Sequence, residues 1–472
     1  MGIASATLLP ATEIARLVRT REISPVEVVE AHLARIDALN PALNAYVHVD
    51  RDGARAAARD AEALVLRRDP LGPLHGVPVS IKSAIAVAGM PWETGSRFRT
   101  GVRAEQDATL VRRLRDAGAI VLGVTNTAEQ LMAWETDNVL YGRTNSPWDL
   151  ARTPGGSSGG ESAAIAAGLS AGGVGSDGGG SIRVPAHFTG ICGLKPTPGR
   201  VPATGHFPPC GGPFALSGVV GPMARTIGDV EVLLHAMAGP DTGDPNGHPV
   251  PLGSSADVRP PLRVGWFEDD GLTPVTRETR EAVQRAARAL EEAGFDVVPF
   301  RPEGLEEARA LWWDIFGRAV RLVLEPLVEG REHDVHPNLL EFLDWTRRQP
   351  KLTAEELLTV EIARDALKAR ISASMAECPV LLCPVSAVPA FRHGEREWMV
   401  DGVRVHYLDA WRYCAWFNLL QNPAVSVPAG RTAEGLPIGV QVVARHWEEH
   451  VALGVAAAIE RALGGFTPPS PR

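Results

Sequence analysis

The stretch GSDGGGSIRVPAHFTG, residues 175–190, places three consecutive glycines directly before Ser181. Most runs of glycine and serine are flexible surface turns. A second interpretation is a nucleotide loop, because Gly173, Gly175 and Gly178 formally satisfy the pattern G-x-G-x-x-G. In a third, bare backbone N–H groups converge where a carbonyl oxygen becomes negative as the Ser181 hydroxyl attacks it. The three interpretations predict different functions.

The residues around the glycines favour the third interpretation. A dinucleotide-binding loop opens a helix whose N-terminus receives the pyrophosphate. The residues after Gly178 include two more glycines and Pro185, so we expect no helix at that place. A solvated linker is polar on both sides, whereas the apolar Ile182, Val184 and Phe188 follow this run. The glycines therefore predict a cradle for an oxyanion, provided that another group takes the proton of the serine.

The composition excludes several classes of protein. Of the 472 residues, 45% are hydrophobic and 22% are charged, which suits a globular enzyme with a large core. The net charge is -9 and basic residues form no cluster, so we expect no nucleic-acid partner. No apolar run reaches the roughly 18 residues of a membrane span, and the charged N-terminal segment does not resemble a signal peptide. We therefore expect no membrane partner and a cytoplasmic location.

Cysteine and lysine usage adds two expectations. The five cysteines are odd in number and form no C-x-x-C pair, which argues against a disulfide framework and a zinc site. Only four of the 47 basic residues are lysines. A desolvated lysine can lose its proton whereas arginine keeps it, so a retained lysine can mark a special site. Lys82, in the apolar segment GVPVSIKSAIAVAG, is either buried near a strand end or packed by its stem at the surface.

Helical and strand patterns alternate along most of the chain, which predicts an α/β fold. Residues 239–261 are rich in Pro, Gly and Asp, and we interpret them as a linker. The expected strands are at 77–82, 119–125, 262–268, 295–300, 379–385, 423–430 and 436–444. The expected helices are at 24–39, 53–67, 107–117, the second half of 153–168, 229–238 and 277–293, at about 306–376 with a break near Pro337, and from 451 onward.

The last strands need partners from the part of the chain before the linker. We therefore predict a single large mixed β-sheet covered by helices on both faces, within a single domain spanning residues 1–472. Within it, the catalytic core lies at about 60–238, and a part that completes the sheet and sets specificity lies at about 262–472.

The base that deprotonates Ser181 is not evident from its neighbours. Histidine is the usual base, but the proximity of His187 in sequence does not fix geometry, and we expect it to be a structural or pocket residue. A formal G-x-S-x-G at residues 156–160 would make Ser158 a nucleophile. That turn must follow a strand directly, whereas ARTPGG precedes it, so we interpret this as a false match.

Taken together, several segments resemble the amidase signature family. They are VPVSIK (77–82), PGGSSGGESAAIAAG (154–168), GSDGGGSIRVPAHFTGICGLKPT (175–197), NPAVSVPAG (422–430) and LPIGVQVVARHWEEH (436–450). The resemblance covers nearly the whole chain, and the spacing of Ser157 and Ser181 agrees with that family. A match of this length is more specific than any single motif. It implies the amidase signature fold and hydrolysis of a carboxylic amide without metal or cofactor.

The resemblance also implies roles for individual residues. Ser181 corresponds to the nucleophile, Ser157 to a bridging serine on an unusual cis peptide, and Lys82 to the terminal base. Lys82 must then be neutral at rest, so that a proton can pass to it from Ser181 through Ser157. An oxyanion hole corresponds to the backbone N–H groups of Gly178, Gly179, Gly180 and Ser181.

Ser158, Asp177 and Arg183 are expected to support this site. Asp177 is predicted to hold the loop by accepting backbone N–H groups, and Arg183 to lie behind it. Two positions depart from the family pattern. The family usually has a side chain at the position of Gly178, so glycine there would loosen the loop. It commonly has an aspartate where this chain has Ser83, which would alter what orients the lysine.

The substrate is less defined than the reaction. In the fatty acid amide hydrolases of this family, the segment after Thr-Asn lines the acyl channel. The similar TNTAEQLMAW, residues 125–134, places Leu131, Met132 and Trp134 at a substrate pocket, to which we add Trp411; the alternative is that these residues are core. Further aromatic candidates are Trp312, Trp313, Phe316 and Trp416.

We therefore predict a serine amidase that acts on a small or medium amide with an apolar or aryl acyl group, through an acyl-enzyme at Ser181. The alternative is the glutaminase subunit of a tRNA-dependent amidotransferase complex. Such subunits hold the glutamine zwitterion with an arginine and an acid. Aligning FNLLQNPA puts Trp411 near the place of the acid, and the arginine has no clear counterpart, so the stand-alone amidase is favoured. The expected partners are a small-molecule amide and, from the family, a second copy in a homodimer.

Overall fold

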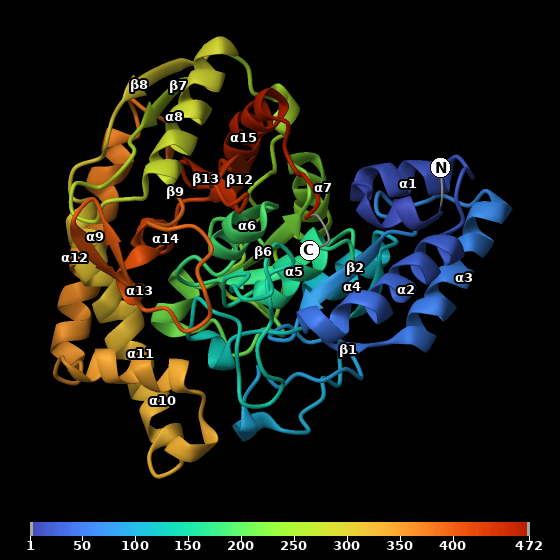
Figure 1. Cartoon of the computed structure of the whole chain (residues 1–472), viewed down its shortest axis with the longest axis horizontal. Helices are drawn as coiled ribbons and strands as arrows, with labels where there is room; N and C mark the ends of the chain where they lie inside the picture. Colours follow the sequence, from blue (N-terminus) through green and yellow to red (C-terminus); the bar gives the residue numbers. More distant parts are fainter. Residues whose placement is uncertain (1–2, 470–472) are drawn as a thin grey trace.

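The computed structural model, which describes residues 3–469, contains one large mixed β-sheet (Figure 1). Its 11 strands run in the order β1-β3-β2-β4-β6-β5-β12-β13-β9-β7-β8. Their bounds are β1 Tyr46–Val49, β2 Pro78–Lys82, β3 Ile120–Thr125, β4 Gly172–Asp177, β5 Cys192–Lys195, β6 Val219–Ala224, β7 Arg263–Trp266, β8 Asp296–Pro299, β9 Val380–Pro384, β12 Ala424–Arg431 and β13 Pro437–Ala444. A separate hairpin pairs β10 Glu397–Val400 with β11 Val403–His406.

Strands from before and after the predicted linker pair in the same sheet, which confirms the expectation of one mixed sheet. Strand β12 pairs antiparallel with β5, so that Val425 lies opposite Leu194. Residues 239–261 contain one short 3-10 helix, Ser255–Asp257, and no strand of this sheet. The division into catalytic core, linker and C-terminal part stays a prediction.

Helices cover both faces of the sheet (Figure 1). One face carries α4 Thr109–Asp116, α7 Ile227–Met237, α8 Arg277–Glu292 and α15 Glu449–Leu463. The other carries α2 Pro25–Leu43, α3 Arg51–Arg67, α5 Gly159–Ala166 and α6 Arg183–Thr189. The remaining helices are α1 Ala11–Arg19, α9 Leu305–Trp312, a π-helical turn η6 Trp313–Arg318, α10 Ala319–Val328, α11 Pro337–Arg347, α12 Ala354–Ser374, α13 Tyr407–Ala410 and α14 Arg412–Leu419. None of the helices between residues 3 and 469 has the length and apolar character needed to cross a membrane.

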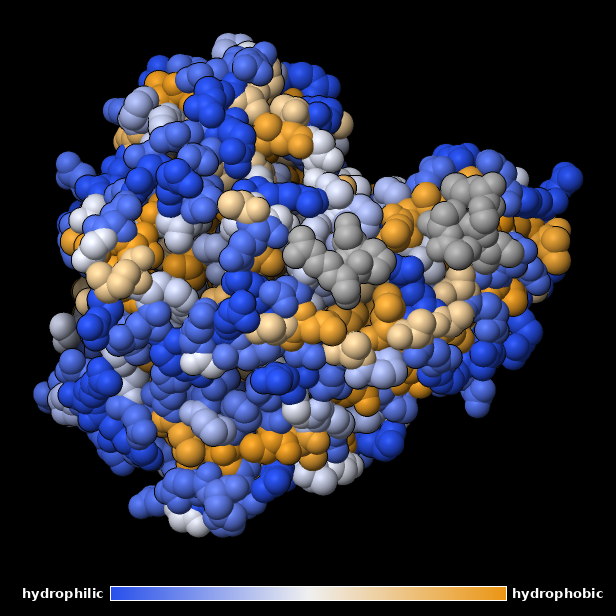
Figure 2. Space-filling model, in the orientation of Figure 1, coloured by the Kyte–Doolittle hydropathy of each residue, from blue (hydrophilic) through white to orange (hydrophobic). Residues whose placement is uncertain are grey.

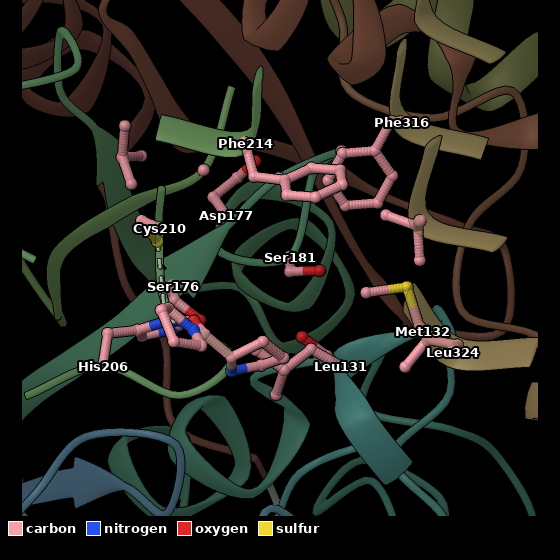
Figure 3. Close-up of a pocket in the computed structure, with 18 of the residues that line it drawn as sticks. Leu131, Met132, Ser176, Asp177, Ser181, His206, Cys210, Phe214, Phe316 and Leu324 are labelled. Atoms are coloured by element: carbon pink, nitrogen blue, oxygen red, sulfur yellow. Dashed lines mark hydrogen bonds between the residues drawn. The ribbon is translucent and has the colours of Figure 1, made fainter. Parts of the chain in front are cut away.

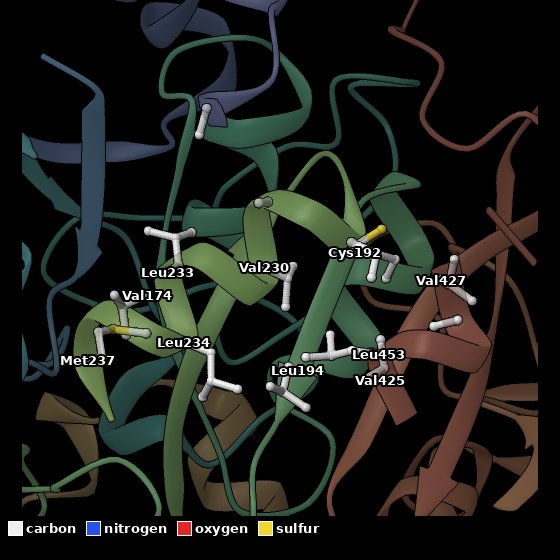
Figure 4. Packing of buried hydrophobic residues seen from close by; sticks show 14 of the residues in the cluster. Val174, Cys192, Leu194, Val230, Leu233, Leu234, Met237, Val425, Val427 and Leu453 are labelled. Atoms are coloured by element: carbon white, nitrogen blue, oxygen red, sulfur yellow. The ribbon is translucent and has the colours of Figure 1, made fainter. Parts of the chain in front are cut away.

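The largest core lies between the sheet and the first of these helix layers (Figure 4). The labelled residues come from α7 (Val230, Leu233, Leu234, Met237), α15 (Leu453), and strands β4, β5 and β12 (Val174, Cys192, Leu194, Val425, Val427). Successive strand residues face opposite sides of a sheet. On β2, Val79 and Ile81 therefore join this core, whereas Ser80 and Lys82 face α5, where their hydrogen bonds lie.

Two expectations about helices are wrong. A helix, α6, does begin shortly after Ser181, because Pro185 lies in its first turn, where no intrahelical bond needs its missing N–H. The nucleotide loop is instead excluded because Gly173 and Gly175 lie inside the buried strand β4, not in the turn after it. In the region 306–376 the α-helices break between Val328 and Pro337, as predicted, and Pro337 begins α11. A second break, between α11 and α12, was not predicted and makes three α-helical segments rather than two.

Candidate active site

The predicted site residues lie at one edge of the sheet. Strands β2, β3 and β4 are parallel, so their carboxyl ends meet there. Lys82 is the last residue of β2 and Asp177 is the last residue of β4. In open α/β sheets, ligands bind outside the carboxyl ends of the strands. The topology thus brings together segments that are far apart in the sequence.

Lys82 is fully buried and contacts three hydroxyl groups. Its Nζ lies 2.6 Å from Ser157 Oγ, 2.9 Å from Ser158 Oγ and 3.1 Å from Ser176 Oγ. The hydroxyl of Ser158 in turn donates to the carbonyl oxygen of Ser176, at 3.2 Å. Of the two alternatives that the sequence left open for Lys82, the structure therefore has the buried lysine near a strand end.

Burial also sets the protonation of this lysine. The loss of water disfavours the ammonium form and lowers the pKa of Lys82 to about 7, against the attraction of Asp177 and Glu161. Glu161, on α5, accepts hydrogen bonds from Ser80 and Thr125, and its own burial raises its pKa to about 7. Near neutral pH a large fraction of Lys82 is therefore the neutral amine.

Ser157 and Ser158 lie where the chain enters α5. The peptide between Gly156 and Ser157 is cis, as the resemblance implies. No strand precedes Ser158 directly, in keeping with our rejection of the G-x-S-x-G match. Ser158 faces Lys82, and its backbone N–H donates to the carbonyl of Ser181 at 3.2 Å. This bond ties the two serine segments together.

Ser181 lies between Gly180 and the start of α6, and it lines a cavity that Ser157 also lines. Gly180 has a φ of 110°, a left-handed conformation that favours glycine. Among residues 3–469, the Ser181 hydroxyl has no hydrogen-bond partner and does not bond to Ser157. The Ser181 hydroxyl is thus free to meet a substrate, and catalytic hydrogen bonds commonly tighten only in the complex.

Asp177 and Arg183 form a buried ion pair behind the glycines. The Asp177 carboxylate accepts the N–H of Gly180 at 2.7 Å, the N–H of Ile182 at 3.0 Å, and two bonds from the Arg183 guanidinium. Burial alone would raise the pKa of Asp177, but the attraction and hydrogen bonds of Arg183 outweigh burial and hold it well below its usual range. The predicted support by Asp177 and Arg183 is thus present as geometry.

The N–H groups of the glycine segment are not equivalent. The prediction that Gly180 contributes to an oxyanion hole is wrong for this structure, because its N–H donates to Asp177. The N–H groups of Gly178, Gly179 and Ser181 have no hydrogen-bond partner within the described residues. All three residues line the cavity, so three of the four predicted donors are available there.

The cavity has a volume of about 280 Å³ and is mostly apolar (Figure 3). In Figure 3, Ser181 lies between the rings of Phe214 and Phe316 on one side and Leu131 and Met132 on the other. The other lining residues outside the glycine and serine segments are Trp134, His206, Pro208, Pro209, Cys210, Gly218, Val219, Val320, Val323, Leu324 and Phe342. Leu131, Met132 and Trp134 therefore line it as predicted.

Trp411 does not line this cavity, which corrects its assignment to the substrate pocket. It lies behind Trp134, and the two rings stack with 3.3 Å between their centroids. Of the further aromatic candidates, Phe316 lines the cavity, whereas Trp312, Trp313 and Trp416 do not. Sequence alone could not separate residues that face the substrate from residues that support them.

The glycine at position 178 does not leave a gap. A Cβ built there would lie 2.8 Å from Cε2 and 2.9 Å from Cζ of Phe316. The ring of Phe316 thus fills the space that a side chain at position 178 would occupy. Packing from η6 thus takes the place of the missing side chain, and the expectation that this departure loosens the loop stays a prediction.

The structure adds two polar residues that sequence reasoning missed, and it gives a place to His187. Ser176 is the third hydroxyl at Lys82, and its position two residues before Gly178 could have suggested it. Asn418, on α14, donates to the Asp177 carboxylate at 2.9 Å, and nothing in the local sequence marked it. His187 is a structural residue, since its Nδ1 accepts the N–H of Gly439 at 2.7 Å.

Comparisons with known proteins agree with this architecture. Residues 27–453 match the model of the family described as Amidase. An acylamidase of Rhodococcus erythropolis is 36% identical, covering 96% of this chain and 95% of its own. A glutamyl-tRNA(Gln) amidotransferase subunit of Salinispora arenicola is 34% identical, covering 98% and 99%. The solved structure of a bacterial aryl acylamidase of the amidase signature enzymes superposes with a TM-score of 0.85 over 96% of both chains, at 27% identity.

Proposed function

This chain belongs to the amidase family and is an enzyme that hydrolyses amides, and we propose that it uses Ser181 as nucleophile, Ser157 as bridge and Lys82 as base. The observation that carries this proposal is the position of Lys82. It is buried, its pKa is lowered to about 7, and its Nζ lies 2.6 Å from Ser157 Oγ beside the cavity that Ser181 lines. A neutral amine in contact with a serine hydroxyl is a suitable terminal base.

The hydrogen bonds around Lys82 support a defined direction of proton transfer. The Ser158 hydroxyl donates a hydrogen bond to the Ser176 carbonyl, so Ser158 Oγ can only accept an N–H from Lys82. Ser176 Oγ can accept the second N–H of the neutral amine. The remaining lone pair of Nζ then faces Ser157, whose hydroxyl proton it can accept.

The reaction that follows from this arrangement has two halves. As Ser181 Oγ bonds to the amide carbon, its proton passes to Ser157 while the proton of Ser157 passes to Lys82. The developing oxyanion accepts N–H groups of Gly178, Gly179 and Ser181. Breaking the C–N bond returns the proton by the same relay to the leaving amine, and water then hydrolyses the acyl-enzyme to a carboxylate.

The cavity supports an apolar or aryl acyl group of small or medium size. Among its described lining residues, Asp177 carries the one formal charge at neutral pH, and that charge is paired with Arg183. An amino acid zwitterion would therefore bury its charges without partners, at a cost of several kcal/mol. Two similar proteins are an acylamidase and an aryl acylamidase, which supports an acyl amide as the substrate.

The second candidate function is that of a glutaminase subunit. It is suggested by the similarity to a subunit of a glutamyl-tRNA(Gln) amidotransferase.

The test is the release of ammonia or amine by the purified chain alone, from glutamine and from short aliphatic, aryl and long-chain amides. We expect turnover of apolar amides, its loss in Ser181→Ala, and a mass shift of one acyl group on the native chain. Turnover of glutamine alone, or activity only with partner subunits, would favour the second candidate.

The expected homodimer and cytoplasmic location stay predictions. Light scattering after size exclusion would measure the first, and fractionation of cells the second. Neither bears on the relay, since all of its residues come from one chain.

A further inference from the structure

Two indole groups hold consecutive carbonyl groups of the glycine segment. Trp312 Nε1, at the end of α9, donates to the carbonyl oxygen of Gly178 at 3.1 Å. Trp134 Nε1, in the loop after β3, donates to the carbonyl oxygen of Gly179 at 3.0 Å. Both tryptophans are buried. These bonds come from parts of the chain that lie far from the glycines in sequence.

The two neighbouring carbonyl groups are held as well. Asn418 Nδ2 donates to the carbonyl of Asp177 at 3.1 Å, and the N–H of Val184 donates to the carbonyl of Gly180 at 2.7 Å. All four carbonyl groups from 177 to 180 thus accept a hydrogen bond. A peptide plane with a fixed carbonyl cannot rotate freely, so the direction of its N–H is fixed too.

In a trans peptide the N–H points opposite to the C=O. The N–H of Gly179 shares a plane with the Gly178 carbonyl and therefore points away from Trp312. The N–H of Gly180 shares a plane with the Gly179 carbonyl and points away from Trp134, to Asp177 at 2.7 Å. The first N–H has no protein partner within the described residues and its residue lines the cavity, whereas the second is already bonded.

We propose that Trp134 and Trp312 are positioning residues, whose indole N–H groups aim the Gly179 N–H at the oxyanion and direct that of Gly180 to Asp177. This inference rests on the proposed function, because it assigns the support of the proposed oxyanion hole. Trp312 reaches the reacting atoms only through the backbone that it holds, whereas Trp134 also lines the cavity.

The packing around the indoles agrees with this role. A Cβ at Gly179 would lie 2.7 Å from Cζ2 of Trp312, so the approach that makes the hydrogen bond requires glycine there. Trp411 contacts both indoles, stacked on Trp134 and edge-on to Trp312 with 4.9 Å between centroids. Trp411, which does not reach the cavity, thus helps to fix the two donors.

The expected size of the effect follows from preorganisation. Loss of one oxyanion donor typically lowers kcat by about 10²–10³-fold. Loss of a group that only aims a donor lowers kcat less, because the donor remains and is merely less well directed. We therefore expect about a tenfold loss of kcat when the indole N–H of Trp312 is removed.

The test uses Trp312→Phe in the full chain, since phenylalanine keeps an aromatic ring but has no N–H and Trp312 does not line the cavity. Trp148→Phe is the matched control, because Trp148 Nε1 donates to the carbonyl of Thr189 at 2.9 Å, at the far end of α6. The substrate is the best amide of the panel above. Phenylboronic acid, which forms a tetrahedral adduct with a serine nucleophile, reports oxyanion binding separately.

For Trp312→Phe we expect kcat to fall about tenfold with KM changed less than about threefold, and the Ki of phenylboronic acid to rise about tenfold. Trp134→Phe releases the peptide whose N–H donates to Asp177 rather than to the oxyanion, so its kcat should fall less, and KM should change as well because Trp134 lines the cavity. Trp148→Phe should show none of these changes. A kcat for Trp312→Phe equal to that of Trp148→Phe, or a change in KM alone, would overturn the inference. Turnover that survives in Ser181→Ala would instead refute the proposed function, so the two failures are distinguishable.

Discussion

The reacting side and the wall of the cavity are built in different ways. We define the reacting side as Lys82, Ser157, Ser158 and residues 176–183, and the wall as residues 305–347. The reacting side is almost fully buried and held by hydrogen bonds and one ion pair. The wall presents apolar side chains to the cavity. Helix α10 also exposes Leu322, Val323 and Leu327 to solvent. The molecular surface as a whole is mostly hydrophilic, with scattered apolar patches (Figure 2).

The difference indicates a division of labour. A buried polar network tolerates little change, because loss of one partner leaves another buried group unsatisfied. An apolar wall fixes shape without directional bonds, and it accepts substitutions that keep volume roughly constant. Changes on the reacting side should therefore affect kcat and stability, and changes on the wall should affect which acyl group is accepted.

The largest effect is expected from Lys82→Met, which keeps a buried chain of similar length but removes the proposed base. We expect kcat/KM to fall about 10³-fold, because general acid–base catalysis contributes about 10²–10⁴-fold. In the native enzyme, protonated Lys82 cannot accept a proton, and burial lowers its pKa to about 7. The native kcat/KM should therefore rise with pH up to about 7 and level above it. Steady-state assays from pH 5 to 9 measure both expectations.

Lys195→Met is the matched control for this comparison. Lys195 is also fully buried, and burial lowers its pKa to about 7, yet its Nζ donates to the carbonyl of Pro196 and contacts no serine of the site. We expect kcat within about threefold of the native value. An equal loss of activity in Lys82→Met and Lys195→Met would mean that the effect of Lys82 does not come from its contact with Ser157.

Asp177→Asn should give the next largest effect. It removes the charge that faces Arg183 and puts an amide N–H₂ group where backbone N–H groups donate. Breaking a buried pair from one side costs about 3–5 kcal/mol, so we expect a stability loss of that order together with a lower kcat. Urea unfolding above pH 5 measures this loss. At acid pH the difference in the free energy of unfolding between the native chain and Asp177→Asn should narrow. The stabilisation from the Asp177 carboxylate is lost in the native chain as the pH falls through the lowered pKa of Asp177.

A surface pair provides the contrast. Asp296 bonds to Arg263 at 2.7 Å, but both side chains are about half exposed. Asp296→Asn should change the free energy of unfolding by less than about 1 kcal/mol. If both variants lost the same amount, burial of the Asp177 pair would not be what stabilises the reacting side.

How far the sequence predicts the molecule also differs between these two regions. Most of the reacting side lies in glycine and serine segments that resemble the amidase signature family, so most of its residues could be predicted from the sequence, whereas Ser176 was missed and Lys82 lies in a separate strand. The N–H of Gly180 could not be assigned, because the orientation of its peptide depends on Asp177 and Trp134 in space. In the wall, the π-helical turn η6 changes the helical repeat, so periodicity does not predict that Phe316 faces the cavity.

The sheet shows the same limit. Strands that are rich in branched apolar residues, such as Ile120–Thr125, were predicted, whereas β4, with the sequence GGVGSD, was not. Glycine has low strand propensity, and β4 is a strand because β2 and β6 pair with it on either side. Elements that tertiary pairing creates leave little signal in their own residues.

Gly178→Ala tests where the two regions meet, with an intermediate effect. The new Cβ would lie within 3 Å of the Phe316 ring, and such overpacking typically costs about 1–3 kcal/mol. We expect kcat to fall about tenfold, as the loop shifts from the position that the ring now supports. Adding Phe316→Leu, which removes the ring, should restore part of the loss. A double-mutant cycle measures this coupling, and strictly additive losses would show that the two regions are independent.

The smallest effect is expected on the wall itself. Leu324, on α10, is buried and lines the cavity, so Leu324→Ala enlarges the space for the acyl group. Size discrimination in apolar pockets is about 10-fold or more per methylene, so we expect the ratio of kcat/KM for a longer over a shorter acyl amide to rise about tenfold. Leu327, on the same helix, is 48% exposed and does not line the cavity. Leu327→Ala should leave this ratio unchanged. Equal changes of the ratio in the two variants would mean that a shift of the whole helix α10, and not the space left by Leu324, alters the preference for acyl length.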